Sequence, residues 1–422
     1  MMPHRLLLMT MPGAHRRFTL VRVVAWLAVA TLALTTSQLT AADWPRWRGP
    51  HADGVVHDQD APLTAAPNQW PELWRADVGT GFSSLAVADG RVYTLGHRDE
   101  QETIWCLDAT NGAVLWQHSY PEPLDPNLFE GGPTATPTVA AGKVLAISRQ
   151  GQVHCLDAAT GELLWRVELT KACEVNVPQW GFAGSPVVHG ELVLLNAGSR
   201  GVALRLADGG VAWQSDNSDD AGYATPLLMR QGERTFALML SGKALHAIDP
   251  ATGNELWNYR WLTRYGINAA DPIVTGDRVF LSSGYGKGSV LLQVQESGVE
   301  ERWRSRELRN QMSPGVLVDG VVYAVDGDAG SDTLLKAIAI DSGATLWSRP
   351  GLGSATLIAV GNTLCVLSGE GELLLAPANP ASWQPLAQKP LLTGKCWTPP
   401  AFADGVLYAR NAAGTLVAVR LR

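Results

Sequence analysis

Aromatic, cationic and amide side chains gather just ahead of short apolar segments that recur along this chain. An aromatic face stacks on planar groups and cations, an ammonium or guanidinium group pairs with anions, and an amide both donates and accepts hydrogen bonds. Such a set suits a planar anion or an acidic peptide. The candidate binding residues are Trp180, Arg264, Tyr265, Asn268, Arg309, Asn310, Lys395 and Trp397, accompanied by Phe82, Phe182, Tyr223 and Gln311. The alternative is that these side chains only fill space in the fold.

Two loops imitate known ligand-binding motifs. The segment Gly284–Ser289 (GYGKGS) is rich in glycine like a phosphate loop, but it lacks the Walker spacing and a strand pattern follows it. Asp326–Asp332 has carboxylates at alternate positions, as calcium loops do, but lacks the glycine at the sixth position and the closing glutamate. A hairpin loop and a polar turn are therefore favoured. No metalloprotease or zinc spacing occurs, so the sequence names no catalytic residue and no metal ligand.

The elements that must position these residues form a repeat. The segment Cys155–Trp165 (CLDAATGELLW) returns as CLDATNGAVLW and as HAIDPATGNELW, with weaker copies elsewhere. Successive steps between the closing residues Trp116, Trp165, Trp213 and Trp257 are 49, 48 and 44 residues. A period of this size predicts a repeat architecture.

Each repeat contains the parts of four antiparallel strands. A first strand follows Pro or Ser, a Gly-containing turn leads to a second strand, and an Asp-x-x-Thr-Gly turn joins the third strand to a fourth that carries Trp. This is the pattern of a propeller blade. We count eight first strands and eight closing residues, namely Trp74, Trp116, Trp165, Trp213, Trp257, Trp303, Trp347 and Trp383.

The two ends of the repeat region complement each other. The last unit, 398–422, has three strands and no closing Trp, whereas Trp74 belongs to a fourth strand with no blade before it. We therefore predict an all-β, eight-bladed β-propeller of four-stranded antiparallel blades, closed by the N-terminal strand. The predicted domains are a signal peptide (1–42), an N-terminal extension (43–72) and the propeller (73–422).

Residues 1–42 have the features of a secretory signal peptide. Arg16, Arg17 and Arg22 precede an apolar run, and Thr40–Ala42 is a small-residue cleavage site. The apolar run is too short to span a bilayer. We predict a periplasmic or secreted protein with no transmembrane segment after cleavage. The net charge of −7 at pH 7 argues against nucleic acid as a partner.

The chain has five cysteines, an odd number. At least one thiol must therefore stay unpaired within the chain. Cys106, Cys155 and Cys365 fall in apolar strand patterns, which favours buried free thiols.

The unit A-x-D-x-x-T-G-x-x-x-W resembles the repeat of the PQQ-like β-propellers over about residues 73–422. This superfamily contains quinoprotein alcohol dehydrogenases and BamB-like outer-membrane assembly factors. The segments DWPRWRGP, WGFAGSP, TRYGIN and CWTPP further resemble secreted bacterial propellers with PQQ-binding-like repeats. No Trp-Asp pair ends the third strands, which disfavours WD40 repeats.

The resemblance implies two kinds of function. The dehydrogenases hold PQQ over a disulfide of adjacent cysteines, with Ca²⁺ bound by Glu, Asn and Asp; this chain has no adjacent cysteines. BamB-like factors carry a lipidated N-terminal Cys, whereas Asp43 follows the cleavage site here. We predict a non-catalytic binding or scaffold module of the periplasm or cell envelope. Its ligand would be an envelope protein or peptide, or a small anion at the channel mouth. The alternative is a PQQ- and calcium-dependent dehydrogenase of alcohols or sugars.

Overall fold

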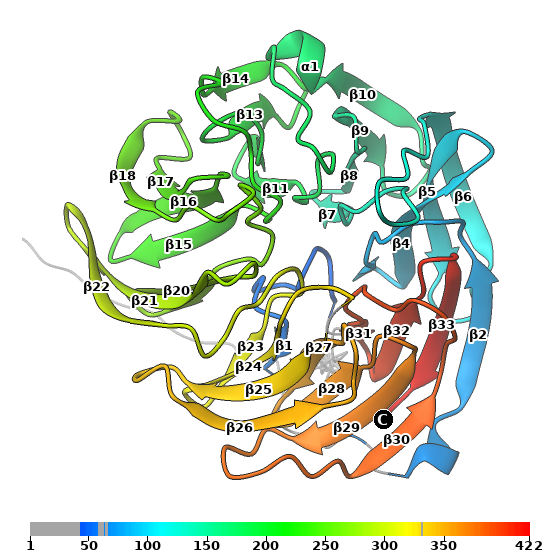
Figure 1. Cartoon of the computed structure of the whole chain (residues 1–422). Coiled ribbons are helices and arrows are strands. Elements are labelled where there is room, and N and C mark those ends of the chain that lie inside the picture. Colours follow the sequence, from blue (N-terminus) through cyan, green and yellow to red (C-terminus); the bar gives the residue numbers. More distant parts are fainter. Residues whose placement is uncertain (1–42, 58–62, 64–65, 331) are drawn as a thin grey trace, which may run out of the picture. The chain divides into compact units, whose positions relative to one another are not determined.

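The computed structural model describes residues 43–57, 63, 66–330 and 332–422. The chain divides into a first unit, residues 1–40, which lies outside this description, and a second unit, residues 41–422. The predicted signal peptide therefore also lies outside the described residues. The second unit is a ring of eight antiparallel blades, so the predicted fold class is confirmed (Figure 1).

Seven blades follow one another along the chain. Blade 1 comprises β3 (Ala86–Ala88), β4 (Arg91–Arg98), β5 (Gln101–Asp108) and β6 (Val114–Pro121). Blade 2 comprises β7 (Thr138–Ala140), β8 (Lys143–Ile147), β9 (Gln152–Asp157) and β10 (Leu163–Glu168). Blade 3 comprises β11 (Val187–His189), β12 (Leu192–Leu195), β13 (Val202–Arg205) and β14 (Val211–Gln214). The next two comprise β15 (Leu227–Gln231), β16 (Arg234–Leu240), β17 (Ala244–Ile248) and β18 (Glu255–Arg260); and β19 (Ile273–Thr275), β20 (Arg278–Ser283), β21 (Gly288–Gln295) and β22 (Gly298–Ser305). Blades 6 and 7 comprise β23 (Val316–Val318), β24 (Val321–Asp326), β25 (Leu334–Ala339) and β26 (Thr345–Pro350); and β27 (Thr356–Val360), β28 (Thr363–Leu367), β29 (Glu372–Pro377) and β30 (Ala387–Pro390).

The eighth blade joins the two ends of the ring. It combines β31 (Ala401–Ala403), β32 (Val406–Arg410) and β33 (Thr415–Arg420) with β2 (Glu72–Asp77), and Trp74 pairs with Ala418. The predicted closure by the N-terminal strand is therefore confirmed. Arg410 strengthens this seam, because its fully buried guanidinium donates to the carbonyl oxygens of Leu95 in blade 1 and Gly79 after β2.

The repeated Asp-x-x-Thr-Gly turn is a receptor for the Trp of the preceding blade. In blade 2 the Asp157 carboxylate accepts hydrogen bonds from the backbone of Ala159 and Thr160 and closes the turn. Gly161 then adopts a φ of +74°, and a Cβ there would lie 2.6 Å from the ring of Trp116. The Trp116 indole donates to the Ala158 carbonyl oxygen in the same turn. The same arrangement joins Trp74 to Gly112, Trp165 to Gly209, Trp213 to Gly253 and Trp303 to Gly343.

A β-bulge aims each of these indoles at the next blade. The pairing register shifts at the residue before Trp in seven fourth strands, for example between Leu163 and Trp165. A bulge re-aims the side chain that follows it. The exposed residue in the bulge, such as Leu164, is the counterpart of the buried Trp165.

Trp383 was wrongly predicted to close a fourth strand. It lies before β30, in the turn of blade 7, and its ring is 5.8 Å from that of Trp347 in blade 6. The Trp position of β30 holds Ala387, which pairs with Leu375, and this strand has no register shift. The buried Trp70, which follows the 3-10 turn η1 (Pro67–Gln69), joins the same core cluster as Ala387. The segment before β2 also contacts β30 directly, because the Lys389 ammonium donates to the carbonyl oxygen of Trp70.

The first part of the N-terminal extension, residues 43–57, lies at the centre of the ring (Figure 1). Trp44 exchanges two backbone hydrogen bonds with Val87 of β3, and Pro45 accepts one from Val139 of β7. The short strand β1 (Val55–Val56) then pairs in parallel with β27. First strands have an inner edge with no neighbour in the blade, and the extension covers that edge in three blades.

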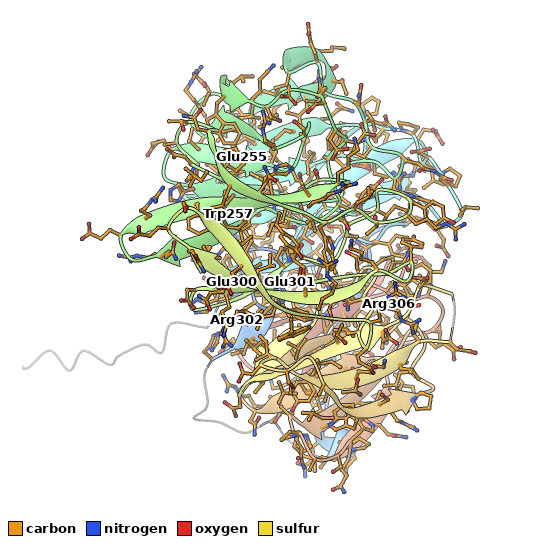
Figure 2. All side chains as sticks on the ribbon, turned by 60° about the vertical axis from the view of Figure 1, so that its left-hand side comes forward. Glu255, Trp257, Glu300, Glu301, Arg302 and Arg306 are labelled. Carbon is orange, nitrogen blue, oxygen red and sulfur yellow. The ribbon has the colours of Figure 1, made fainter. Side chains whose placement is uncertain are left out.

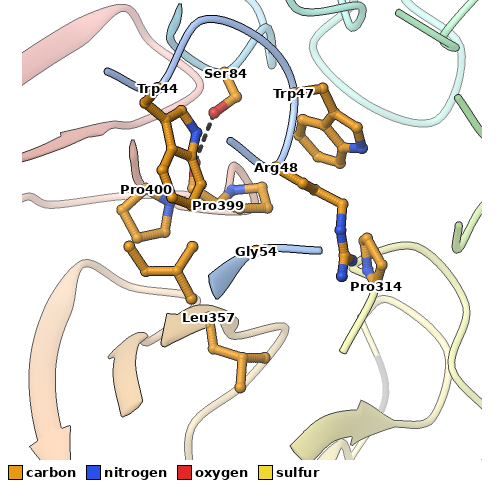
Figure 3. Close-up of a pocket in the computed structure, with 10 residues that line it drawn as sticks. Trp44, Trp47, Arg48, Gly54, Ser84, Pro314, Leu357, Pro399 and Pro400 are labelled. Atoms are coloured by element: carbon orange, nitrogen blue, oxygen red, sulfur yellow. Dashed lines mark hydrogen bonds between the residues drawn. The ribbon is translucent and has the colours of Figure 1, made fainter. Parts of the chain in front are cut away.

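Two side chains anchor the extension to further blades. The buried Arg48 donates to the carbonyl oxygen of Gly315, just before β23, and to those of Ala52 and Asp53. Figure 3 shows the Arg48 side chain beside Pro314. The Trp47 indole donates to the Asp271 carboxylate, which also accepts the backbone N–H of Thr225. Burial raises the pKa of Asp271. The channel of the propeller is therefore filled by the chain's own N-terminal segment.

Apart from η1, the one helix of the described part is α1 (Leu169–Ala172), and within that part no helix is long and apolar enough to cross a membrane. All five cysteines are buried and free, as predicted for Cys106, Cys155 and Cys365. Burial raises the pKa of the Cys106 and Cys155 thiols to about 11, so they stay protonated and unreactive.

The contact between turn and indole can be tested with a pair of glycine substitutions in blade 2. Gly161→Ala places an alanine in a left-handed backbone conformation and brings its methyl group against Trp116. Gly142→Ala has the same kind of backbone, at a φ of +70°, but its methyl group meets no atom within 4 Å. The backbone strain alone costs about 1–2 kcal/mol. We expect Gly142→Ala to lose about that much unfolding free energy and Gly161→Ala to lose clearly more, measured by urea denaturation. Equal losses would show that the indole contact does not constrain the turn.

Candidate binding site

An aromatic cup opens on the face of the ring that carries the connections from each fourth strand to the next first strand. Its volume is about 400 Å³, in the range of small-molecule and peptide pockets. Its wall is formed by Trp47, Phe82, Leu128, Phe129, Thr134, Trp180, Ala183, Tyr223, Ile267, Ala269, Tyr285, Gln311, Met312, Ser313, Ala329, Trp397 and Pro399. We call this cavity the cup.

Four rings form a continuous aromatic wall. The ring of Phe82 lies 5.5 Å from Phe129 and 6.1 Å from Trp397, and Phe129 lies 6.0 Å from Trp180. These separations are within the range of favourable aromatic contacts. Trp47 of the extension borders both the cup and the small cavity shown in Figure 3. The extension that fills the channel therefore also limits the depth of the cup.

Buried polar groups hold the loop that carries Leu128 and Phe129. The Glu122 carboxylate accepts hydrogen bonds from the backbone N–H of Gln150 and from the side chain of Gln152. The buried Arg149 donates to Asp125, and its guanidinium carbon lies 4.9 Å from the Phe129 ring centroid. The loop is tied to blade 2 at these points, so the Phe129 ring is held in place.

A second loop brings Trp180 to the cup. Gly181 has a φ of +74°, and a Cβ there would lie 2.9 Å from the Cβ of Arg149, so the chain needs glycine to turn here. The Trp180 Nε1 is buried and has no hydrogen-bond partner among the described residues. It is therefore an unused donor in the wall of the cup.

Of the eight candidate binding residues, Trp180 and Trp397 line the cup, together with Phe82, Tyr223 and Gln311 from the accompanying set. Tyr265 is 57% exposed and lies outside the lining, but its ring contacts Tyr285, 5.1 Å away, which does line it. Arg264 stacks on Tyr265, with its guanidinium carbon 5.3 Å from the ring centroid.

Two candidate amides have structural partners. Asn268 is fully buried; it donates to the carbonyl oxygens of Ser241 and Trp261 and accepts from the Ser283 hydroxyl. The buried Asn310 donates to the carbonyl oxygen of Ser313, which lines the cup. These amides hold loops of the mouth and do not face the cup.

Two of the three candidate cations, Lys395 and Arg309, are paired with carboxylates. Lys395 Nζ lies 2.8 Å from Glu130 and 4.3 Å from the ring centroid of Trp397. Arg309 makes a two-pronged contact with the buried Asp326, to which Lys336 also binds. These two cations already have counter-charges, so the mouth offers less free positive charge than its sequence indicates.

Several lining residues escape sequence reasoning. Phe129 and Leu128 lie inside a long connection, Tyr285 and Ala329 follow second strands, and Trp47 belongs to the extension. For Leu128 and Phe129, only the length of the connection before β7 indicates a functional loop. The two loops that resemble ligand-binding motifs connect strands. Gly284–Ser289 begins in the hairpin loop between β20 and β21. In the aspartate-rich loop, Asp326 forms an ion pair with Arg309.

The cup does not fit the cofactor set of the dehydrogenases. Its wall holds no Asp, Glu or Cys, and its oxygen donors are hydroxyl and amide groups such as Thr134 and Gln311. Calcium favours sites with several carboxylate oxygens. No group of three or more His, Cys, Asp or Glu in the described part of the chain could hold a metal ion. A PQQ site over adjacent cysteines with bound calcium does not match these residues.

A protein family described as outer membrane protein assembly factor BamB matches residues 100–349. The outer membrane protein assembly factor BamB of Moranella endobia (strain PCIT) is 34% identical over 100 residues. That match covers 24% of this chain and 25% of the relative, so it spans about a quarter of the relative's length.

Solved structures with low sequence identity share the fold. BamB from Moraxella catarrhalis has a TM-score of 0.63 at 17% identity and covers 83% of this chain and 99% of its own. A europium-containing methanol dehydrogenase has a TM-score of 0.68 at 14% identity and covers 90% of this chain and 98% of its own. The quinohemoprotein alcohol dehydrogenase of Comamonas testosteroni has a TM-score of 0.65 at 15% identity, with 90% and 80% covered. Because BamB and the dehydrogenases match alike, the fold does not choose between an assembly factor and an enzyme.

Glu102 gives the loop region a pH-dependent stability. This fully buried carboxyl of β5 accepts a hydrogen bond from Tyr120, and its other oxygen has no partner among the described residues. Burial and the neighbouring Glu122 raise the pKa of Glu102 to about 8. The folded state therefore holds a proton that the unfolded state releases above its ordinary pKa of 4.5.

We expect the unfolding free energy to fall as the pH rises from about 4.5 to about 8. In this range Glu102 is protonated in the folded state and ionised in the unfolded state, so a higher pH favours unfolding. Glu102→Gln should flatten this slope, whereas Glu100→Gln, at an exposed carboxylate of the adjoining turn, should keep it. Urea denaturation at a series of pH values measures the slope. An unchanged slope in Glu102→Gln would contradict the assignment.

Proposed function

The chain belongs to the family described as outer membrane protein assembly factor BamB, and on this premise we propose that it is a non-catalytic binding module. The cup is its binding site, and the ligand is a peptide segment of a partner protein that inserts apolar or aromatic side chains. The partner is proposed to be a protein of the cell envelope, because the Moranella endobia relative is an outer membrane protein assembly factor.

The composition of the cup carries this proposal. Its wall joins Phe82, Phe129, Trp180 and Trp397 to amide and hydroxyl groups, without a carboxylate. Rigid aromatic walls with a few polar groups bind side chains well, because little side-chain entropy is lost on binding. A small anion is the weaker ligand, because Lys395 at the rim is already paired with Glu130.

Residues 1–42 support a periplasmic or secreted location. Their basic, apolar and small-residue segments have the order of a signal peptide. An extracytoplasmic protein would meet envelope partners directly, which agrees with the proposed ligand.

Peptide binding at the cup can be measured with short synthetic peptides in which Phe and Ser alternate. We expect saturable quenching or enhancement of tryptophan fluorescence, because Trp180 and Trp397 line the cup. Trp397→Ala should weaken binding by about tenfold, or about 1.4 kcal/mol. Leu386→Ala, which removes a 57% exposed apolar side chain on blade 7, is the control and should leave the affinity unchanged.

Two results would contradict this function. One is equal affinity for a Ser-only peptide, since the aromatic wall would then contribute nothing. The other is reduction of a dye by the purified protein with PQQ, Ca²⁺ and an alcohol or sugar, lost in Trp397→Ala. That outcome would establish the dehydrogenase alternative.

Export is tested by expressing the full chain in a Gram-negative host and sequencing the N-terminus of the purified periplasmic protein. Cleavage after Ala42 should leave Asp43 as the first residue, because Thr40–Ala42 has the small side chains that signal peptidase requires. A mature protein that retains Arg16 and Arg17 would contradict the proposed location.

A further inference from the structure

A second depression lies between outer strands of the ring and shares no lining residue with the cup. The outer strands β18 of blade 4 and β22 of blade 5 border a cavity of about 680 Å³. Figure 2 shows Trp257 on the first strand and Glu301 on the second. We call this cavity the trough; Arg260, Lys287 and Arg304 bring three cations to its wall.

One of the cations is fixed by a small network. Arg304 donates to the Glu301 carboxylate and to the Tyr259 hydroxyl, at 2.7 and 2.6 Å, and that hydroxyl donates to Glu301 at 2.6 Å. The Arg304 guanidinium carbon lies 5.6 Å from the ring centroid of Trp261, whose buried indole donates to Ser283. Glu301 therefore compensates Arg304 and holds it in position.

Glu301, which binds Arg304, is also the carboxylate whose charge acts on Lys287. Lys287 Nζ lies 4.4 Å from the centroid of Trp261, and no ion pair in the described part of the chain includes Lys287 or Arg260. Burial and the positive charges of Arg304 and Arg260 lower the pKa of Lys287. Lys287, Arg260 and Arg304 therefore lie around one carboxylate of the trough wall, Glu301, and leave a local excess of positive charge.

We propose that the trough binds the carboxylate groups of an acidic peptide segment, with Lys287 and Arg260 as the pairing cations and Arg304 as the fixed one. A bound carboxylate removes the repulsion between the cations and gains charge-assisted hydrogen bonds. Glu301 lies among them, so a dianionic phosphate is repelled more strongly than a single carboxylate. Leu262, 41% exposed, adds an apolar surface in a cavity far larger than one small anion.

The test uses a fluorescein-labelled peptide of alternating Glu and Leu and a matched peptide of alternating Gln and Leu, with binding followed by anisotropy. We expect only the Glu peptide to bind, with an affinity that falls as salt increases. Lys287→Gln and Arg260→Gln should each weaken binding by about fivefold, the upper range for a partly exposed ion pair. Arg302→Gln, on β22 outside the trough, is the control with the same change of net charge and should lower the affinity less.

Three results would overturn the proposal. The first is equal binding of the Gln peptide, and the second is an equal loss of affinity in Arg302→Gln and Lys287→Gln. The third is binding of inorganic phosphate, measured by calorimetry and abolished in Lys287→Gln, without binding of the Glu peptide. Circular dichroism of each variant separates loss of binding from loss of folding.

Discussion

The contact between one indole and one turn is the constraint on which this ring depends. A bulge before Trp aims the indole out of its own blade, and a left-handed glycine in the next blade leaves room for it, as Trp116 and Gly161 show. The indole also satisfies a carbonyl oxygen of the turn that receives it. Burying one indole is worth at most about 5 kcal/mol before entropy is counted, and the contact recurs around the ring. Adjacent blades therefore stabilise each other, and a blade without a closing Trp needs a substitute. In blade 7, which has Ala387 at this position, the buried Trp70 from outside the repeat joins the same core cluster.

A ring built in this way leaves the inner edges of its first strands without partners. The extension covers three of the eight edges, because Trp44, Pro45 and β1 pair with β3, β7 and β27. Arg48 is the corresponding polar anchor: its charge is buried, and its hydrogen bonds to carbonyl oxygens connect the extension to blade 6. The same segment presents Trp47 to the cup. The same segment thus closes the channel and forms part of the wall of the cup. A deeper cup would require Trp47 and its neighbours to move, which would break hydrogen bonds between the extension and several blades.

Most of the fold could be predicted from the sequence, because the repeat encodes local chemistry. Asp157, Thr160 and Gly161 specify a turn through short-range hydrogen bonds and a left-handed φ, and the spacing to Trp specifies the strand between them. Trp383 was wrongly assigned because the turn before it has no Thr-Gly pair, so only the distance from the preceding Trp residues suggested that it closes a strand. The cup was predictable only in part. The loop positions of Trp180 and Trp397 follow from topology, but whether an amide such as Asn268 turns inward depends on partners distant in sequence. Trp47 has no periodic signal at all.

Charge compensation distinguishes the two surfaces. At the mouth, Lys395 and Arg309 each face a carboxylate, so the aromatic wall remains as the unsatisfied feature, together with the free Nε1 donor of Trp180. In the trough, the aromatic group Trp261 is buried beneath the cations, and positive charge is the feature left without a partner. The Asp-x-x-Thr-Gly turns that hold the blades do not line the cup, whereas the trough includes the closing residue Trp257 and Gly298 from the turn between β21 and β22. The loops of the cup can therefore differ in chemistry while the ring stays the same. A partner with both apolar and acidic segments could therefore meet this protein at two places, each recognising a different part of it.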